Sequence, residues 1–570
     1  MSMLSRPRGA RPGRLALAIG ALLVACSSNP SQSPSTSPAA SDGPGGTAIP
    51  CKTSSLVLTS PGTYYELFVR SFADSNGDGI GDLRGLTEHL DYLNDGDPAT
   101  TDDLGVHGLW LMPVAESPSY HGYDVTDYTA IERDYGTRED FLAFVDAAHE
   151  RGITVLVDFV INHTSRDHPW FQDAQTPGSE HDDWYVWSDT DPGWPPAAGP
   201  NPWHPSGDRF YYGAFWEGMP DLNLRNDEVT AEIERIAHVW IDEYGVDGFR
   251  LDAAKHLIED GPLAQVNTPD THTWLKGFND AVGRPVEALV LGEVWDPRGT
   301  TVGYIEDGSL DLVFDFGIGA TIESSVRLGD ANSLEVNQLE ILDRYPSEGG
   351  TAATFLTNHD QPRVMTNFRG DLDRAKQAAA ALLTGPGLPF IYYGEELGMV
   401  GTKPDEQIRT PFPWTADEPG FGFTTAAPWE PFADGAATSN VATESADDAS
   451  LLSAYRDLIR VRSENAALAA GAYVTVDTGV FGISAVLRTT PGNSVLVVHN
   501  LTNEPANDLE FSGESPDLCG QPSGAVIYSS DTTITGPASS PTIGPNGRLE
   551  PWAPLPELPA HSTVVFDLSP

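Results

Sequence analysis

Short apolar runs and longer amphipathic segments alternate along residues 63–395 of the chain. Each apolar run is rich in β-branched or aromatic residues, and a loop and a helix-like segment follow it. We expect strands at residues 64–69, 108–112, 154–160, 248–251, 288–292, 312–316, 354–356 and 388–392. Eight successive units of strand and helix predict a (β/α)8 barrel.

The spacing between these units is uneven, which indicates additional domains. Residues 163–223 are crowded with Trp, Pro, Gly and Asp and lack periodicity, so we expect an inserted subdomain after strand 3. A helix at 451–463 and alternating strands separated by turns then predict a C-terminal antiparallel β-sandwich domain at residues 466–570. The predicted fold class is α/β, a TIM barrel built from residues 56–162 and 224–465 that carries both additions.

The N-terminal residues have the layout of an export signal. A basic stretch from Arg6 to Arg14 precedes an apolar run at 15–25 that is too short to span a membrane. The sequence Leu-Val-Ala-Cys at 23–26 resembles a bacterial lipobox, so we expect loss of a signal peptide, residues 1–25, and a lipid on Cys26. The alternative is ordinary secretion with an incidental cysteine. Residues 26–55 have the composition of a flexible tether.

The net charge limits the possible binding partners, and the cysteine content predicts a disulfide. The formal net charge of −50 opposes binding to nucleic acid and to anionic membrane surfaces, and it suits a neutral ligand such as a sugar. We expect an exported monomer that touches a membrane only through its lipid. Cys51 and Cys519 form an even pair in an exported chain, which predicts one disulfide, although sequence alone does not bring them together.

Charged and polar residues gather directly after the predicted strands, where a barrel of this kind places its catalytic groups. Three strand ends deliver carboxylates, namely Asp252, Glu293 and Asp360. Cleavage of a glycosidic bond needs one carboxylic acid to protonate the leaving oxygen and one carboxylate to attack or to activate water. A single Asp at a strand end is more typical of a cap or a turn, so the prediction depends on the ordered set.

Four segments, at 158–163, 248–256, 292–295 and 358–360, closely resemble in this order the conserved regions of the α-amylase family of retaining glycoside hydrolases, over about residues 60–570. Residues 108–113, 121–124 and 219–223 reinforce the resemblance. It implies that Asp252 is the nucleophile, Glu293 the acid and then the base, and Asp360 the residue that grips the distorted sugar. The implied substrate-binding residues are His121, Tyr123, Asp124, His163, Arg250, Lys255, His256 and His359.

The resemblance is intermediate between the oligo-1,6-glucosidase-like and neopullulanase-like branches, and it extends to lipoprotein and secreted α-amylases of bacteria. Lys255 and His256 resemble endo-acting enzymes, whereas Asp124 and residues 358–363 resemble exo-acting ones. We expect retaining hydrolysis of α-1,4-glucosidic bonds in starch-type glucans and maltooligosaccharides. The alternatives are an exo-acting α-glucosidase or oligo-1,6-glucosidase, a transglycosylating relative such as a trehalose synthase, and a non-catalytic sugar-binding protein.

A calcium site is predicted in the loop after the first strand. Its alternating oxygen ligands, with glycines that permit a tight turn, are Asp74, Asn76, Asp78, the backbone carbonyl of Ile80, and Asp82. The alternative is an Asx-rich turn, but the loop resembles the calcium loop of oligosaccharide-cleaving family members. The resemblance also implies a second Ca²⁺ site formed by Asn162, Asp221 and the backbone carbonyl of His256.

Overall fold

The structure, a computed structural model, describes residues 62–345 and 351–570. The predicted signal peptide at 1–25, the tether at 26–55, the lipid-bearing Cys26 and Cys51 all lie outside the described residues. Within the described part, no helix combines the length and the apolar composition that crossing a membrane requires.

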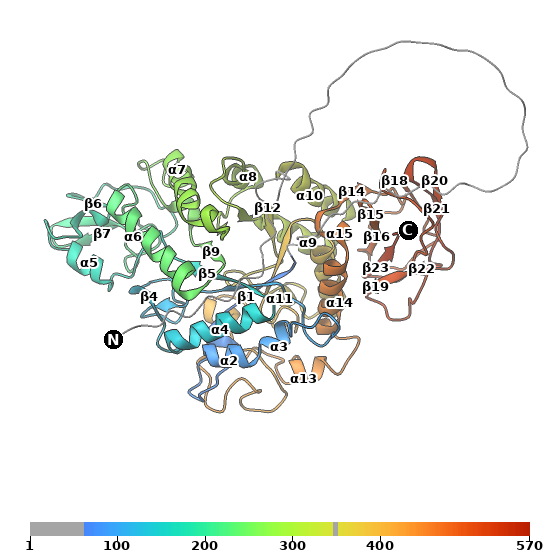
Figure 1. The fold of residues 1–570 in the computed structure, drawn as a ribbon, viewed down its shortest axis with the longest axis horizontal. Helices are drawn as coiled ribbons and strands as arrows, with labels where there is room; N and C mark the ends of the chain where they lie inside the picture. Colours follow the sequence, from blue (N-terminus) through green and yellow to red (C-terminus); the bar gives the residue numbers. More distant parts are fainter. Residues whose placement is uncertain (1–61, 346–350) are drawn as a thin grey trace, which may run out of the picture.

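Eight parallel strands close into a barrel, as the sequence pattern predicted (Figure 1). Around the barrel their order is β1, β13, β12, β11, β10, β9, β5 and β2, and β2 pairs with β1 to close it. The strands are β1 (Tyr64–Leu67), β2 (Gly108–Leu111), β5 (Thr154–Phe159), β9 (Gly248–Leu251), β10 (Leu289–Gly292), β11 (Leu312–Phe314), β12 (Thr351–Thr354) and β13 (Leu388–Tyr392).

The seventh strand is the one whose predicted position was wrong. We expected it at residues 354–356, but β12 spans Thr351–Thr354. Its sequence, Thr-Ala-Ala-Thr, contains no large apolar residue and so lacks the pattern that marks the other strands. Ala353 belongs to the cluster of side chains that fills the barrel, next to the large rings of Phe314 and Phe390. Small residues on this strand leave room for those rings.

Helices surround the barrel, and those that precede β13 in the chain lie between its strands (Figure 1). In chain order they are α1 (Val69–Phe72), α2 (Leu83–Glu88), α3 (Leu90–Leu93), α4 (Arg138–Glu150), α6 (Asp227–His238), α7 (Pro269–Phe278), α8 (Arg298–Glu306), α9 (Phe316–Leu328), α10 (Ala331–Arg344), α11 (Val364–Asn367), α12 (Leu372–Leu383), α13 (Val441–Glu444), α14 (Leu451–Glu464) and α15 (Ala466–Ala470). Their apolar faces and the outward residues of the strands form the largest core of the protein.

A small subdomain projects from the barrel between β5 and α6, on the left of Figure 1. It contains α5 (Pro169–Ala174) and an antiparallel sheet of β6 (Trp187–Ser188), β8 (Arg209–Tyr212) and β7 (Trp203–Ser206). Its own apolar cluster is built around Trp203 and Tyr212. A separate hairpin of β3 (Ala115–Glu116) and β4 (Asp127–Ile131) follows β2.

The C-terminal domain consists of antiparallel sheets that enclose a separate apolar core. The largest sheet has the order β14 (Ala472–Thr475), β15 (Ile483–Thr490), β16 (Asn493–Asn500), β23 (Ser562–Asp567) and β19 (Val526–Ser529). Facing it are β18 (Phe511–Glu514), β21 (Arg548–Trp552) and β20 (Ile543–Gly544), with β17 (Ala506–Asn507) and β22 (Glu557–Leu558) beside them.

Cys519 is buried and disulfide-bonded, and its partner lies outside the described residues. The pairing with Cys51 stays a prediction.

Two buried arginines, one from the barrel and one from this domain, bind the carbonyl groups at the end of α12. Arg462, on α14, donates to the carbonyl oxygens of Leu383, Gly385 and Gly387 at 2.6–2.8 Å. Arg488, on β15, donates to the carbonyl of Thr384 at 3.0 Å. Burial lowers the pKa of Arg462 to about 9 and that of Arg488 to about 10, so both stay protonated at neutral pH. Together they satisfy the carbonyl groups at the end of α12, where a cation is also favoured by the helix dipole.

We expect Arg462→Met to lower the free energy of unfolding by about 3 kcal/mol, because it leaves buried carbonyl groups without donors. The measurement is chemical denaturation followed by tryptophan fluorescence. Arg460→Met is the matched control, since Arg460 on the same helix is partly exposed and forms an ion pair with nearby Asp457. Its effect should stay within about 0.5 kcal/mol. Equal effects of the two substitutions would show that the buried contacts contribute little.

Candidate active site

Because side chains alternate along a strand, the ends of the barrel strands point polar side chains into the mouth of the barrel. Leu156 and Leu291 fill the barrel interior, and two residues later Asp158 and Glu293 face the same side because side chains of a strand alternate. Both carboxylates stand at the C-terminal ends of their strands, where barrel enzymes place catalysis. Further polar groups brought to this mouth are Glu66, Arg250, Asp252, His359 and Asp360.

The guanidinium of Arg250 holds three carboxylates together. Its Nη1 lies 2.7 Å from Asp252 Oδ1 and 2.9 Å from both carboxylate oxygens of Asp158. Its Nη2 lies 2.9 Å from Glu293 Oε2. The Arg250 side chain is 1% exposed, and its guanidinium carbon lies 5.0 Å from the ring centroid of Trp110. A fully buried cation is thereby balanced by the two predicted catalytic residues and by Asp158.

Burial and charge act in opposite directions on the two predicted catalytic carboxylates. Burial raises the pKa of Glu293 to about 7, with Asp252 and Asp360 adding to the rise and Arg250 opposing it. Burial also raises the pKa of Asp252, and the direct hydrogen bond from Arg250 counteracts this. Glu293 accepts one backbone hydrogen bond, from Ala253 N at 3.1 Å. Glu293 is therefore suited to carry a proton near neutral pH.

Asp360 lies within a second charged group. Arg409 Nη2 donates to its Oδ1 at 3.0 Å, and His359 Nε2 lies 3.3 Å from its Oδ2. Burial alone would raise the pKa of Asp360, but the positive charges of Arg409 and Lys403 contribute to a net lowering of this pKa. Asp360 therefore stays ionised and can accept hydrogen bonds from hydroxyl groups of a ligand.

The imidazole of His359 lies between the carboxylates around Arg250 and the pair formed by Asp360 and Arg409. Its Nδ1 lies 2.5 Å from Glu66 Oε1, and its Nε2 lies 2.8 Å from the hydroxyl of Tyr123. The rings of Tyr123 and His359 are stacked at 5.5 Å, and the Tyr123 hydroxyl donates to Asp158 Oδ2 at 3.0 Å. Burial lowers the pKa of His359 well below its usual value, so the ring is neutral.

Asp124 and two predicted sugar-binding histidines lie beside Tyr123. His121 stacks on Tyr123 at 6.0 Å between ring centroids, and its Nδ1 accepts a hydrogen bond from Tyr123 N. Asp124 accepts hydrogen bonds from the hydroxyls of Ser117 and Ser119. His163 Nε2 donates to the carbonyl oxygen of Tyr123 at 3.0 Å. Asp124 is thus held by hydroxyl donors.

His163 and Lys255 have partners within the protein, whereas His256 Nδ1 is buried and has no hydrogen-bond partner among the described residues. The His163 Nδ1 lies 3.2 Å from Asn162 Nδ2, so both of its ring nitrogens are engaged within the protein. Lys255 Nζ donates to the carbonyl oxygen of Trp295 and to Asp296 Oδ2, at 2.7 and 2.9 Å. Burial lowers the pKa of His256 to about 4, which keeps the ring neutral.

These groups surround a cavity of about 240 Å³. Its walls are formed by His121, Tyr123, His163, Phe215, Met219, Asp252, His359, Asp360, Asp405 and Arg409. Phe215 lies between His163 and His256, with ring centroids 5.3 and 5.2 Å away. The cavity therefore combines aromatic walls with carboxylates, a combination that suits a sugar ring with its apolar faces and polar edge.

Sequence reasoning missed Arg409, Asp405 and the structural roles of Glu66 and Asp158. Arg409 follows β13 and binds both the carbonyl oxygen of His359 and the carboxylate of Asp360. Its position after a barrel strand was the available signal, but it lies outside the segments that carry the family resemblance. Glu66 lies inside β1 among aromatic residues, where its partner His359 is 293 residues away in the chain.

The predicted calcium loop is closed by its own hydrogen bonds. Asp74 accepts from the backbone amides of Asn76, Gly77 and Gly79 at 2.7–3.0 Å. Asp82 accepts from Gly85 N and so caps α2. Among the described residues, no group of three or more His, Cys, Asp or Glu side chains is placed to hold a metal ion. The calcium prediction for this loop stays a prediction.

The second predicted metal site has an unusual buried atom. Asn162 Oδ1 is buried and has no hydrogen-bond partner among the described residues. The neighbouring Asp221 is 3% exposed, and burial raises its pKa well above the usual range. An unpaired oxygen beside a buried carboxylate is costly unless a cation or a water completes it. The donor chemistry here fits a hard, oxygen-seeking cation.

Comparison with known proteins gives consistent matches. A family described as alpha amylase, catalytic domain, matches residues 66–471. An α-amylase of Dictyoglomus thermophilum is 39% identical over 460 residues, covering 79% of this chain and 86% of its own. A trehalose synthase/amylase of Mycolicibacterium smegmatis is 33% identical over 510 residues, covering 78% and 84%. The solved structure of the α-amylase from H. orenii is 40% identical with a TM-score of 0.78, covering 90% of this chain and 100% of its own.

We expect kcat/KM to fall as pH rises through about 7, because the predicted role of Glu293 as the acid requires its protonated form and its pKa is about 7. The measurement is a pH profile on a maltooligosaccharide, which requires protonation of the leaving oxygen. The control is a dinitrophenyl glycoside, whose leaving group departs without an acid and should show no such decline. A decline at the same pH with both substrates would assign it to another group, such as Asp158, whose pKa burial also raises to about 7.

Proposed function

Because the chain belongs to the α-amylase family of glycoside hydrolases, we propose that it hydrolyses α-1,4-glucosidic bonds of starch-type glucans and maltooligosaccharides with retention of configuration. The observation that carries the proposal is the sharing of Arg250 by Asp252 and Glu293. One planar guanidinium contacts both carboxylates, which favours the short separation that a retaining mechanism needs. The neighbouring cavity has the size and lining for a sugar ring.

In the proposed reaction Asp252 attacks the anomeric carbon while Glu293 gives its proton to the departing oxygen. The ion pair with Arg250 keeps Asp252 charged in a buried site. Glu293, left as a carboxylate, then takes a proton from the water that releases the glycosyl enzyme. Two displacements at the same carbon restore the original configuration.

The sugar at the cleavage point is held by Asp360 in this proposal. Its ionised carboxylate accepts hydrogen bonds from two adjacent hydroxyl groups, and Arg409 and His359 fix its orientation. Tyr123 presents an aromatic ring to the apolar face of the sugar. These contacts strengthen as the ring flattens toward the oxocarbenium-like transition state, so they favour the reaction over simple binding.

A trehalose synthase or an exo-acting glucosidase is the second candidate. The catalytic cavity, at about 240 Å³, has room for few sugar units, and Asp405 and Arg409 form part of its wall. Relatives named trehalose synthase, including those of Pimelobacter and Thermus thermophilus, are 32–34% identical to this chain. We favour the α-amylase because the proteins with that name are more similar, at 39% and 40% identity.

We expect maltoheptaose to yield a mixture of shorter maltooligosaccharides from the first turnovers, because internal bonds are cleaved. The measurement is chromatography of products at less than a tenth of conversion, with Asp252→Asn as the variant that lacks the nucleophile. Glucose as the single early product would identify an exo-acting enzyme. Trehalose formed from maltose would identify the synthase instead.

We also propose that the protein binds Ca²⁺. Asp74, Asn76, Asp78, Asp82 and the carbonyl of Ile80 would hold one ion, and the glycines at 77 and 79, with φ of 77° and 97°, permit the turn between these donors. Asn162 and Asp221 with the carbonyl of His256 would hold another, which is supported by the unpaired Asn162 oxygen. Bound ions would stabilise the loops and leave the proton transfers to the carboxylates.

We expect removal of calcium to lower the melting temperature, because an ion that binds only the folded protein adds about 1.4 kcal/mol for each tenfold excess over its Kd. The measurement is thermal unfolding of stripped protein titrated with CaCl₂, with MgCl₂ as the control. Asp74→Asn should weaken the response if the loop binds, and Asp221→Asn if the second site binds. An unchanged melting curve after verified stripping would contradict both sites.

A further inference from the structure

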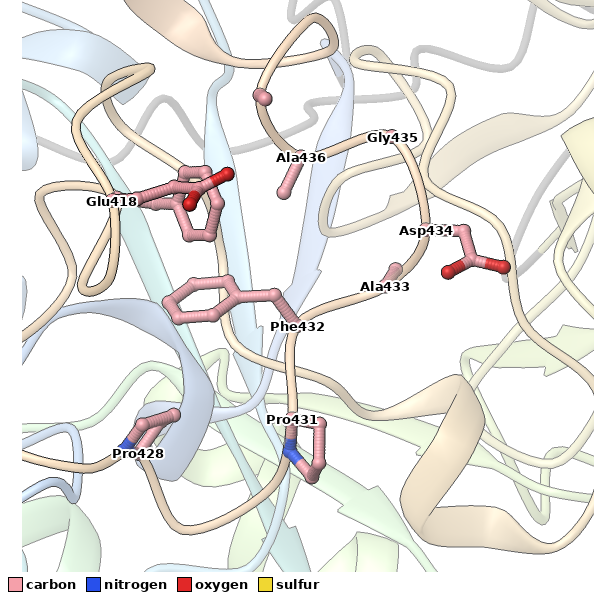
Figure 2. A pocket seen from close by; sticks show the side chains of 10 residues that line it. Glu418, Pro428, Pro431, Phe432, Ala433, Asp434, Gly435 and Ala436 are labelled. Atoms are coloured by element: carbon pink, nitrogen blue, oxygen red, sulfur yellow. The ribbon is translucent and has the colours of Figure 1, made fainter.

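Two cavities outside the catalytic one share a wall of four residues, 431–434. The larger, of about 540 Å³, extends to Glu418, Phe421 and Pro428 (Figure 2). The other, of about 410 Å³, extends to Gln407 and Thr410. Phe432 stands on the shared wall, so the two hollows lie along one segment. We call them together the Phe432 groove.

The groove has an aromatic centre. In Figure 2 the ring of Phe432 projects into the hollow above Pro428 and Pro431, with Glu418 beyond it. Its centroid lies 4.7 Å from that of Phe421, with the rings inclined at 67°. Phe421 has a φ of 48°, in the left-handed region that a bulky side chain rarely adopts. Such strain is retained where surrounding structure requires it, and it gathers at binding sites.

Polar atoms border the aromatic centre. Glu418 and Asp434 are exposed at the rim of the larger hollow, and Glu430 lines the smaller one. Thr410 is 4% exposed, and its Oγ1 is buried without a hydrogen-bond partner in the described part of the chain. An aromatic face flanked by hydroxyl acceptors matches a glucose unit, with its apolar faces and hydroxyl rim. The acidic rim and the net charge of −50 disfavour anionic partners.

One end of the groove adjoins the catalytic cavity. Gln407 and Thr410 line the groove, and Arg409 between them lines the catalytic cavity and binds Asp360. The short segment 405–410 therefore forms part of both walls. A glucan chain that is too long for the catalytic cavity can extend to the groove on the other side of this segment.

We propose that the Phe432 groove is a second binding site for α-glucan chains, with the Phe432 ring as the stacking platform. The inference rests on the proposed function and adds to it that long glucans are held at two places on the enzyme. Short maltooligosaccharides occupy the catalytic cavity alone. Residues of the groove thus set the preference for chain length and take no part in bond cleavage.

The test compares long and short ligands in the Glu293→Gln background, where turnover is blocked. Isothermal titration gives the Kd for maltotriose and for soluble amylose, with and without Phe432→Ala. Loss of one stacking contact should weaken amylose binding about tenfold, with maltotriose binding unchanged. The matched control is Phe481→Ala, because Phe481 is 80% exposed on the C-terminal domain and lines neither the groove nor the catalytic cavity. It should change neither affinity.

Asp434→Ala is a second variant, since its exposed side chain can be removed without disturbing the core, and it should weaken amylose binding about threefold. Amylose affinity equal to that of the parent in both variants would overturn the proposal. So would a change in oligomeric state with Phe432→Ala, seen by light scattering, since it would identify the groove as a contact between copies. Absence of glucan hydrolysis by the wild type, with the difference in amylose binding retained, would instead refute the proposed function alone.

Discussion

The buried cation of Arg250 is the interaction on which the active site depends. Burying carboxylates without a cation would drive all of them to the neutral form, because desolvation disfavours charge. Arg250 Nη1 serves Asp252 and Asp158, and Nη2 serves Glu293. The two predicted catalytic groups nevertheless need opposite protonation states. Asp252 receives the shortest of these contacts, at 2.7 Å. The pKa of Glu293, in contrast, is raised by burial and by the charges of Asp252 and Asp360. One cation therefore supports two carboxylates with different roles.

The barrel supplies the positions that this arrangement requires. Each strand exposes every second residue to the interior, so a group at the strand end is aimed by the apolar residues beneath it. Leu291 below Glu293 and Leu156 below Asp158 fix those directions. The aromatic layer continues through Trp110, whose indole N–H lies 3.3 Å from Asp158. The packing of the barrel interior therefore determines where the charged groups at its mouth are placed.

Much of this could be predicted from the sequence, and the reasons for the failures are physical. Seven strands were found near their observed positions because their apolar runs are dense, whereas β12 was misplaced because its alanines and threonines carry no such signal. Asp252, Glu293 and Asp360 stood out because they follow strands in a recognisable order. Arg409 and Glu66 did not stand out, because their roles depend on contacts with His359, which is distant in the chain. Hydrogen bonds that occupy Lys255 and His163 are likewise decided by tertiary structure.

The buried arginines between the barrel and the C-terminal domain have a consequence for how the protein can be divided. Arg488 belongs to the C-terminal domain, yet it donates to the Thr384 carbonyl of the barrel, and Arg462 donates to the adjacent carbonyls. A catalytic fragment that ends near residue 471 would retain Arg462 but lose Arg488, and a buried carbonyl would face solvent at a newly opened apolar surface. Exchange of this domain between relatives would therefore cost stability unless the incoming domain supplies a donor for the Thr384 carbonyl.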